Sequence, residues 1–208
     1  MIAARQTFLG RGGGGGALPP YDAEVEYVQT GNGAWVDTGI KPNSSIVVQL
    51  NLCTLADVSD TIFGFNLGND SEDWRLFNAG QQIFFDWGRG RLTGGSNTLK
   101  NNTWYEFELG NYYVKDIPTG TILLSGTSRD SDTLSDATLA FGRGQNTIGR
   151  IRFGWCKIII GGVLVRDFIP VRFTNENEQT EGALYDRVSK ELFRNSGTGS
   201  LGYGNDKA

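Results

Sequence analysis

The segment WYEFELG, residues 104–110, decides how this sequence folds. Two sets of side chains alternate along it: Tyr105, Phe107 and Leu109 form one set, and Trp104, Glu106 and Glu108 form the other. Successive side chains of a β-strand point to opposite faces of a sheet, so one face of this segment is apolar and the other is polar apart from the tryptophan. The pattern predicts a strand that covers a core with its apolar side.

Similar segments lie on both sides of this strand along the chain. They include residues 25–30, 34–40, 45–52, 61–67, 73–80, 82–88, 121–126, 137–144, 150–162 and 163–171. Short sequences rich in Gly, Asn and Ser separate them, which is typical of turns, and we expect Pro170 to end strand pairing in the last segment. No long stretch has helical periodicity. The sequence therefore predicts an all-β fold, a two-sheet jelly-roll sandwich.

Composition excludes several classes of function. The 208 residues contain 19 basic and 23 acidic side chains, a net charge of −4, and no histidine. No basic patch of the kind that binds nucleic acid stands out, and the commonest metal ligand and general base is missing. No apolar run approaches the length that crosses a bilayer, and the first ten residues do not resemble a signal peptide. We expect no cofactor, no metal, no nucleic-acid partner and no membrane insertion.

The two cysteines, Cys53 and Cys156, lie in apolar segments that are predicted to be strands. Buried free thiols are the main interpretation. A single disulfide between them is the alternative, although two cysteines do not make a disulfide framework.

The chain opens with MIAARQTFLGRGGGGGALPP. Five consecutive glycines lose too much backbone entropy on ordering to hold a helix or strand, so they predict a flexible tether. Two prolines then stiffen the exit from it. We therefore divide the chain into an extended N-terminal arm with a polyglycine tether, residues 1–17, and a jelly-roll domain, residues 18–208.

Glycan recognition requires exposed aromatic rings beside hydrogen-bonding groups. Trp74, Trp87 and Trp104 are the candidate rings, although core packing is the more frequent fate of a tryptophan in a sandwich. The stretch DWGRGRLTGG favours the second of them, because its tryptophan lies at a strand end among Gly and Arg. The predicted glycan-binding residues are Trp74, Asp86, Trp87, Arg89 and Arg91.

Catalytic and metal-binding alternatives are weaker. Glu176, Glu178 and Glu181 are the one group resembling a glycosidase carboxylate set, but they lie in uninterrupted polar sequence that is typical of a solvated loop. Acidic clusters that could bind calcium occur at Asp57/Asp60, Asp70/Glu72/Asp73 and Asp130/Asp132/Asp136, without ordered ligand spacing. The GRGR and FGRG stretches precede no helical pattern, so they do not predict phosphate loops.

Two longer motifs are more specific than periodicity. They are LPPYDAEVEYVQTGNGAWVDTGIKPNS, residues 18–44, and GGVLVRDFIPVRF followed by EGALYDRVSKELFRNSGTGSL, residues 161–173 and 181–201. The second motif predicts a closing hairpin with its turn at Ser189 and Lys190. Together they resemble a family of concanavalin A-like (laminin-G-like) jelly-roll domains, found in virion proteins of tailed phages of gut bacteria and in related bacterial surface proteins. The match is good at both ends and generic in the middle.

This resemblance implies a non-enzymatic virion structural protein, assembled in the host cytoplasm, that displays its jelly roll as decoration, head-fibre or tail component. The arm would dock onto other virion proteins, and the protein is expected to be a homo-oligomer or part of a large assembly. The arm contacts would be Ile2, Arg5, Phe8, Leu9 and Arg11. The alternative is a carbohydrate-binding adhesin module of a gut bacterium that recognises a cell-surface glycan. A glycoside hydrolase is a remote third possibility.

Overall fold

The computed structural model describes residues 19–55, 60–65, 73–88, 90–96, 98–127, 136–143 and 150–208, with the side chain of Asp60 left out. Every regular element in these ranges is a strand, and they contain no helix that could span a membrane. The strands are β1 (Ala23–Glu24), β2 (Val28–Gln29), β3 (Val36–Asp37), β4 (Ile46–Thr54), β5 (Asp60–Phe65), β6 (Asp73–Ala79), β7 (Gln82–Gly88), β8 (Gly90–Thr93), β9 (Trp104–Gly110), β10 (Tyr113–Asp116), β11 (Ile122–Ser125), β12 (Ala140–Phe141), β13 (Ile151–Ile160), β14 (Val163–Thr174), β15 (Thr180–Asp186), β16 (Glu191–Phe193) and β17 (Gly202–Tyr203).

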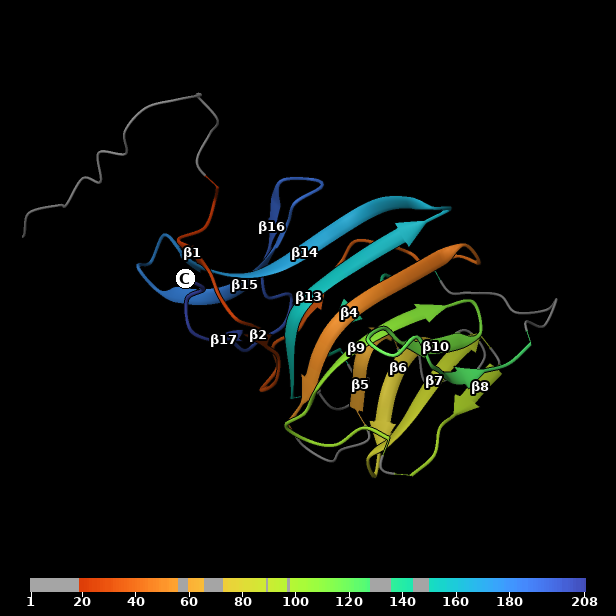
Figure 1. Ribbon diagram of the computed structural model, residues 1–208. Helices are drawn as coiled ribbons and strands as arrows, with labels where there is room; N and C mark the ends of the chain where they lie inside the picture. The colour runs from red at the N-terminus through yellow and green to blue at the C-terminus, as the bar shows by residue number, and fades with distance from the viewer. Residues whose placement is uncertain are drawn as a thin grey trace, which may run out of the picture.

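These strands form two antiparallel sheets packed as a sandwich (Figure 1). The larger sheet follows the order β11-β10-β9-β4-β13-β14-β15-β16, with β1, β2 and β17 attached beside this path. The smaller sheet follows the order β3-β12-β5-β6-β7-β8. The expected all-β, two-sheet jelly-roll sandwich is confirmed.

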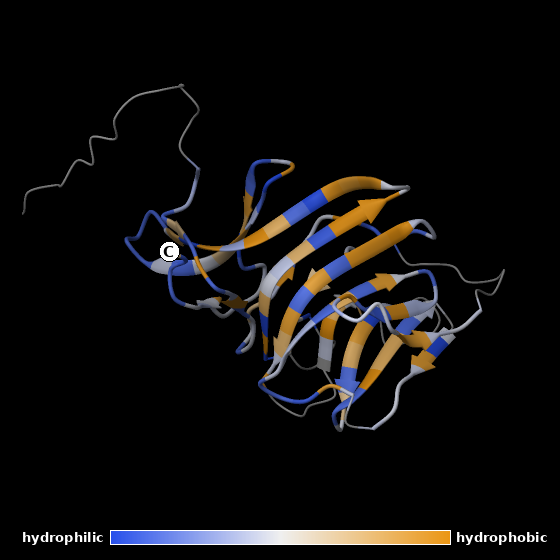
Figure 2. Ribbon diagram, viewed as in Figure 1, coloured by the Kyte–Doolittle hydropathy of each residue, from blue (hydrophilic) through white to orange (hydrophobic). Residues whose placement is uncertain are grey.

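Aromatic rings join the two sheets in the core. The ring of Phe141, from the smaller sheet, lies edge-on to Phe153 and Phe168 of the larger sheet, with centroids 4.8 and 5.7 Å apart. Edge-to-face pairs of this kind add stability beyond the apolar area that they bury. Figure 2 shows apolar and polar residues alternating along β4, β13 and β14.

The C-terminal segment runs antiparallel to the first strands of the domain. β17 pairs with β2, and Val25 forms an isolated bridge with Asp206. Arg172 of β14 holds Asp206 through Nε and Nη2, at 2.6 and 2.8 Å. The N-terminal and C-terminal segments thus form a two-stranded ribbon beside β13 and β14.

The closing hairpin is confirmed, with β15 and β16 joined by a turn that contains Ser189 and Lys190. The expectation for Pro170 is wrong. Pro170 lies within β14 and is paired with Leu184 of β15. On its other side, the pairing of β14 with β13 ends at Phe168, opposite Cys156, and β1 pairs with β14 at Val171 and Arg172. The missing N–H of Pro170 therefore falls where β14 changes neighbours.

Both cysteines are buried free thiols, as predicted. Cys156 is opposite Leu50 and faces the core, whereas Cys53 lies one residue beyond core-facing Leu52 and faces the other side of the sheet. Alternation therefore puts the two thiols on opposite faces.

Candidate functional site

Two tryptophans predicted to bind glycan lie in the core. Trp74 is 0% exposed and Trp87 is 3% exposed. Their rings contact each other at 5.9 Å, and both contact Phe85. A buried ring offers no face to a sugar, so the prediction of a binding platform at Trp74 and Trp87 is wrong. The strand-end position of Trp87 was misleading because β7 continues directly into the hairpin with β8.

Asp86 and Arg91, from the same predicted site, do come together on the outer face of the smaller sheet. Asp86 accepts hydrogen bonds from Nε of Arg75 at 2.8 Å and from Nε and Nη2 of Arg91 at 2.7 and 2.9 Å. Both guanidinium groups also lie over the ring of Phe77. The carboxylate and the ring are already occupied by protein groups, which favours a structural role for this cluster. Arg89 lies outside the described residues.

Two other tryptophans, one exposed and one half-buried, lie instead on the outer face of the larger sheet. Strand alternation sends Trp104 and Glu106 of β9, Gln49 and Asn51 of β4, and Trp155 and Lys157 of β13 to this side. We refer to this side of the larger sheet as its outer face. Trp104 is 43% exposed, and Trp155 is half-buried. The orientation of Trp104 and Glu106 away from the core is the one that the alternation of WYEFELG predicts.

A β-bulge at Gly154 turns Trp155 outward. Phe153 is opposite Leu52, and Trp155 is opposite the very next residue of β4, Asn51, so Gly154 is the extra residue. Strict alternation from buried Phe153 would have pointed Trp155 into the core. A Cβ on Gly154 would clash with Oδ1 of Asn51 and lie 3.5 Å from Cζ3 of Trp104. The bulge therefore brings Trp104, Trp155 and the amide of Asn51 together, and we call this group the aromatic patch. Bulges are often used in this way in functional sites.

Tyr27 and Arg152 extend this patch toward the ribbon. The Tyr27 ring centroid lies 6.2 Å from that of Trp104, and the Arg152 guanidinium lies 4.4 Å above the Tyr27 ring. Arg152 Nε donates to Oε1 of Gln29 at 3.0 Å. Rings with polar groups beside them can bind a ligand that has both apolar faces and hydroxyl groups.

Glu108 lies two residues from Glu106 on β9, but its carboxylate is already bound. It accepts hydrogen bonds from Gln49 Nε2 at 2.7 Å and Tyr113 Oη at 3.0 Å, and it pairs with Lys115 Nζ at 2.5 Å. Burial alone would raise the pKa of Glu108, yet these three donors outweigh it and lower the pKa. Burial and the same carboxylate raise the pKa of Tyr113 to about 12. Glu108 therefore stays ionised at neutral pH and holds the edge of the outer face in place.

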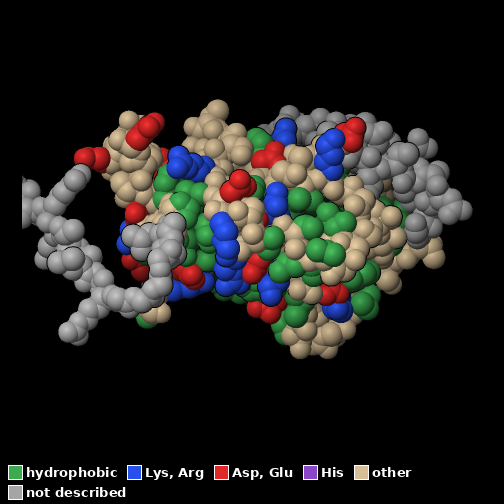
Figure 3. All heavy atoms as spheres, turned by 90° about the horizontal axis from the view of Figure 1, so that it is seen from above, with side chains coloured by type: hydrophobic (Ala, Val, Ile, Leu, Met, Phe, Trp, Pro, Cys, Tyr) green, Lys and Arg blue, Asp and Glu red, His purple; other side chains and the backbone are tan. Residues whose placement is uncertain are grey.

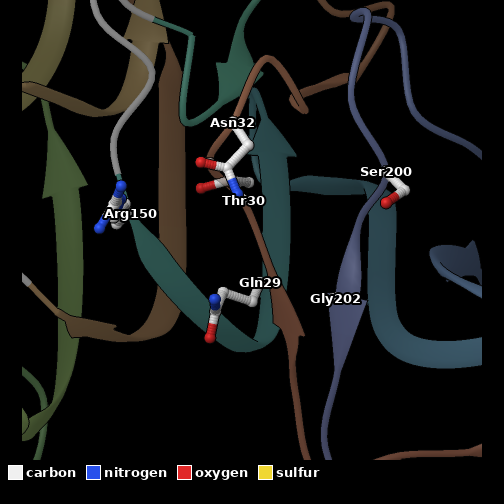
Figure 4. A pocket seen from close by; sticks show the side chains of 7 residues that line it. Gln29, Thr30, Asn32, Arg150, Ser200 and Gly202 are labelled. Atoms are coloured by element: carbon white, nitrogen blue, oxygen red, sulfur yellow. The ribbon is translucent and has the colours of Figure 1, made fainter.

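A polar pocket of about 360 Å³ lies next to Gln29 (Figure 4). Figure 4 shows its side chains coming from the end of β2 and the following turn, from the residue before β13, and from the segment that leads into β17. The lining residues are Gln29, Thr30, Gly31, Asn32, Arg150, Ser200 and Gly202. Because Gln29 also binds Arg152, this pocket adjoins the aromatic patch at Tyr27.

The remaining predictions concern the glutamate set near residue 178, the acidic clusters and the N-terminal arm. Glu176 and Glu178 lie exposed in the turn between β14 and β15, as expected for a solvated loop. Glu181 does not belong to that loop, because it is a half-buried residue of β15 that accepts a hydrogen bond from Asn175 Nδ2 at 2.8 Å. Within the described residues, no group of three or more His, Cys, Asp or Glu could hold a metal ion. The arm, residues 1–17 with its five predicted contacts, lies outside the described residues, as do Asp57, Asp70, Glu72, Asp130 and Asp132 of the acidic clusters.

No protein-family model and no curated protein matches this sequence. A solved structure does resemble the fold. It is the crystal structure of a protein from Bacteroides ovatus described as a "putative carbohydrate binding protein", with a TM-score of 0.51 and 14% sequence identity. The alignment covers 88% of this chain and 61% of the neighbour. At this identity the likeness shows a shared sandwich fold. The membership of the phage-associated jelly-roll family stays a prediction.

Proposed function

We propose that this protein binds carbohydrate through the outer face of β9, β4 and β13. The observation that carries the proposal is the bulge at Gly154, which costs a regular register and in return turns Trp155 outward beside Asn51 and Trp104. A sugar ring has apolar C–H faces that pack on aromatic rings and hydroxyl groups that need donors and acceptors. Asn51 and Glu106, opposite each other on β4 and β9, supply both kinds of group.

The Bacteroides ovatus neighbour supports this class of ligand, because its description names carbohydrate binding on the same fold. The virion role expected from the motifs at the two ends of the domain rests on the arm and stays a prediction. The two ideas are compatible, since a displayed jelly roll can also bind a cell-surface glycan.

A glycan array followed by calorimetry tests the proposal. We expect the wild-type protein to bind a defined group of oligosaccharides, and Trp104→Ala or Trp155→Ala to weaken that binding roughly tenfold or more, because an aromatic anchor is lost. The matched control is Tyr203→Ala, which removes an aromatic ring of similar exposure, 39%, from β17. Absence of binding across the array, or binding that neither tryptophan substitution weakens, would overturn the proposal.

A further inference from the structure

A second pocket, of about 330 Å³, opens from the outer face where β13 meets β14. Trp155 of β13 lines it, and Glu24 and Lys207 line it from the ribbon formed by the two ends of the domain. The lining residues are Glu24, Gly154, Trp155, Lys157, Asp167, Ile169, Arg187 and Lys207. Trp155 thus belongs to both the aromatic patch and this pocket, so a ligand on the patch reaches the charged side chains directly.

The strand registers place a row of polar side chains across the larger sheet at this level. In order across β10, β9, β4, β13 and β14 it reads Lys115, Glu108, Gln49, Lys157 and Asp167. Each end of the row is neutralised within the protein. Lys115 pairs with Glu108 at 2.5 Å, and Asp167 pairs with Arg187 at 2.9 Å. Lys157 lies between the two pairs, opposite the neutral Gln49 on one side.

The charges around Lys157 leave an excess of positive charge. Three cationic and two anionic side chains line the pocket. Arg187 is bound to Asp167, so these two charges offset each other and leave Glu24 against Lys157 and Lys207. In the described part of the chain, neither Lys157 nor Lys207 belongs to an ion pair. Figure 3 shows how basic, acidic and apolar side chains intermingle on the face that it presents, so this local excess is a matter of particular residues and not of a broad basic patch.

We propose that the carbohydrate bound at this face is acidic, with its carboxylate or sulfate group contacting Lys157 and Lys207 while its ring packs on Trp155. The inference rests on the proposed carbohydrate binding and specifies the chemical class of the ligand. A half-buried ammonium group gains most from a partner that is itself charged, because charge-assisted hydrogen bonds are stronger than neutral ones. With a neutral sugar, the nearest opposite charge across the strands is Asp167, whose carboxylate already pairs with Arg187.

The test compares three oligosaccharides of equal length by calorimetry: a neutral hexose oligomer, a hexuronate oligomer and an O-sulfated form of the neutral one. We expect at least one acidic form to bind roughly tenfold more tightly than the neutral form, with a preference that shrinks as sodium chloride is raised. Lys157→Gln should remove this preference, so that the acidic and the neutral oligomer bind that variant with nearly equal affinity. Lys190→Gln, the same change at an exposed turn outside the pocket, should keep the preference.

Each outcome has a distinct meaning. Preference for the hexuronate identifies the anionic group as a carboxylate, and preference for the sulfated oligomer identifies it as a sulfate. Equal affinity for neutral and acidic forms, or a preference that survives in the double variant of Lys157→Gln and Lys207→Gln, overturns this inference and leaves the proposed function standing. Failure of all three oligomers, together with an empty glycan array, overturns the proposed function and this inference with it.

Discussion

Asn51 and Trp155 are opposite each other on β4 and β13 because Gly154 inserts one extra residue between Phe153 and Trp155. If Gly154 took an ordinary place in the alternation, Trp155 would face the same side as Phe153, and its indole would point into the core. The amide of Asn51 is fixed in turn, since its Nδ2 donates to the backbone oxygen of Tyr105 at 3.3 Å and its Oδ1 lies over Gly154. One glycine therefore determines both the ring and the amide that we assign to the ligand.

Substituting Gly154→Ala should damage the site and the fold together. The new Cβ would clash with Oδ1 of Asn51, in a packed region where an extra methyl group typically costs about 1–3 kcal/mol. We expect a lower free energy of unfolding in urea and weaker glycan binding. Gly95→Ala is the control, because the nearest atom to its Cβ would be 3.9 Å away. If Gly154→Ala has the same free energy of unfolding as the wild type, that result would contradict the close packing around the bulge.

The tryptophans should divide into two classes by mutation. Trp74→Ala removes a fully buried ring packed against Phe63, Phe85 and Trp87, and should cost about 3–5 kcal/mol of unfolding free energy. Trp104→Ala should lower the free energy of unfolding much less, but it should remove most of the glycan binding. Denaturation curves and calorimetry on both variants measure the two effects. A large loss of stability in Trp104→Ala with unchanged binding would be incompatible with our assignment.

Asp186 should make stability depend on acid pH. It is fully buried, and its carboxylate accepts hydrogen bonds from the backbone N–H groups of Asp167, Val188 and Ser189 at 2.8, 3.0 and 3.1 Å. Burial by itself would raise its pKa, but these bonds outweigh it and lower the pKa below the ordinary 3.8. The folded pKa is depressed, so the stabilisation is present above pH 3.8 and is lost as pH falls through the lower, folded-state pKa.

Asp186→Asn should therefore lose about 1–3 kcal/mol of unfolding free energy at pH 7, the usual range for hydrogen bonds to a charged group. The difference in unfolding free energy between the wild type and Asp186→Asn should become smaller as the pH falls below about 4. Urea denaturation at a series of pH values measures it. A difference that stays constant from pH 7 to pH 3 would show that the ionised carboxylate contributes nothing.

The two thiols should be inert in the folded protein. Burial raises the pKa of both, and for Cys156 the neighbouring Asp167 adds to the effect. Since the thiolate is the reactive form, we expect almost no reaction with a thiol reagent under native conditions and two equivalents after denaturation. If the wild-type protein, denatured without reductant, reacts with fewer than two equivalents of reagent, its cysteines form a disulfide. That result would contradict the placement of Cys53 and Cys156 on opposite faces of the sheet.

The sequence predicts most of the strands and one half of the site. Alternation in WYEFELG places Trp104 and Glu106 on the outer face correctly, because a strand that covers a core must alternate. It fails for Trp155, which lies in the mainly apolar run from Ile151 to Ile160. The glycine before it is the one signal of a bulge, and a glycine within a strand can equally mark a bend or a close backbone approach.

The wrong choice of Trp74 and Trp87 has a related cause. Both tryptophans stand beside charged residues in the sequence, and in a strand such neighbours point to the opposite face of the sheet. Asp73, Arg75 and Asp86 are therefore evidence for buried rings next to them. The ribbon between the two ends of the domain was also beyond local patterns, since the pairing of β2 with β17 joins residues more than 170 positions apart.

The most direct test of the central claim is an NMR titration that follows the indole N–H signals of the five tryptophans while a glycan selected on the array is added. The account predicts that the signals of Trp104 and Trp155 shift with saturation while those of buried Trp74 and Trp87 stay in place. The fifth tryptophan, Trp35, directly precedes β3 of the smaller sheet. Shifts confined to Trp35, or an unchanged spectrum at saturating glycan, would contradict a binding site on the outer face.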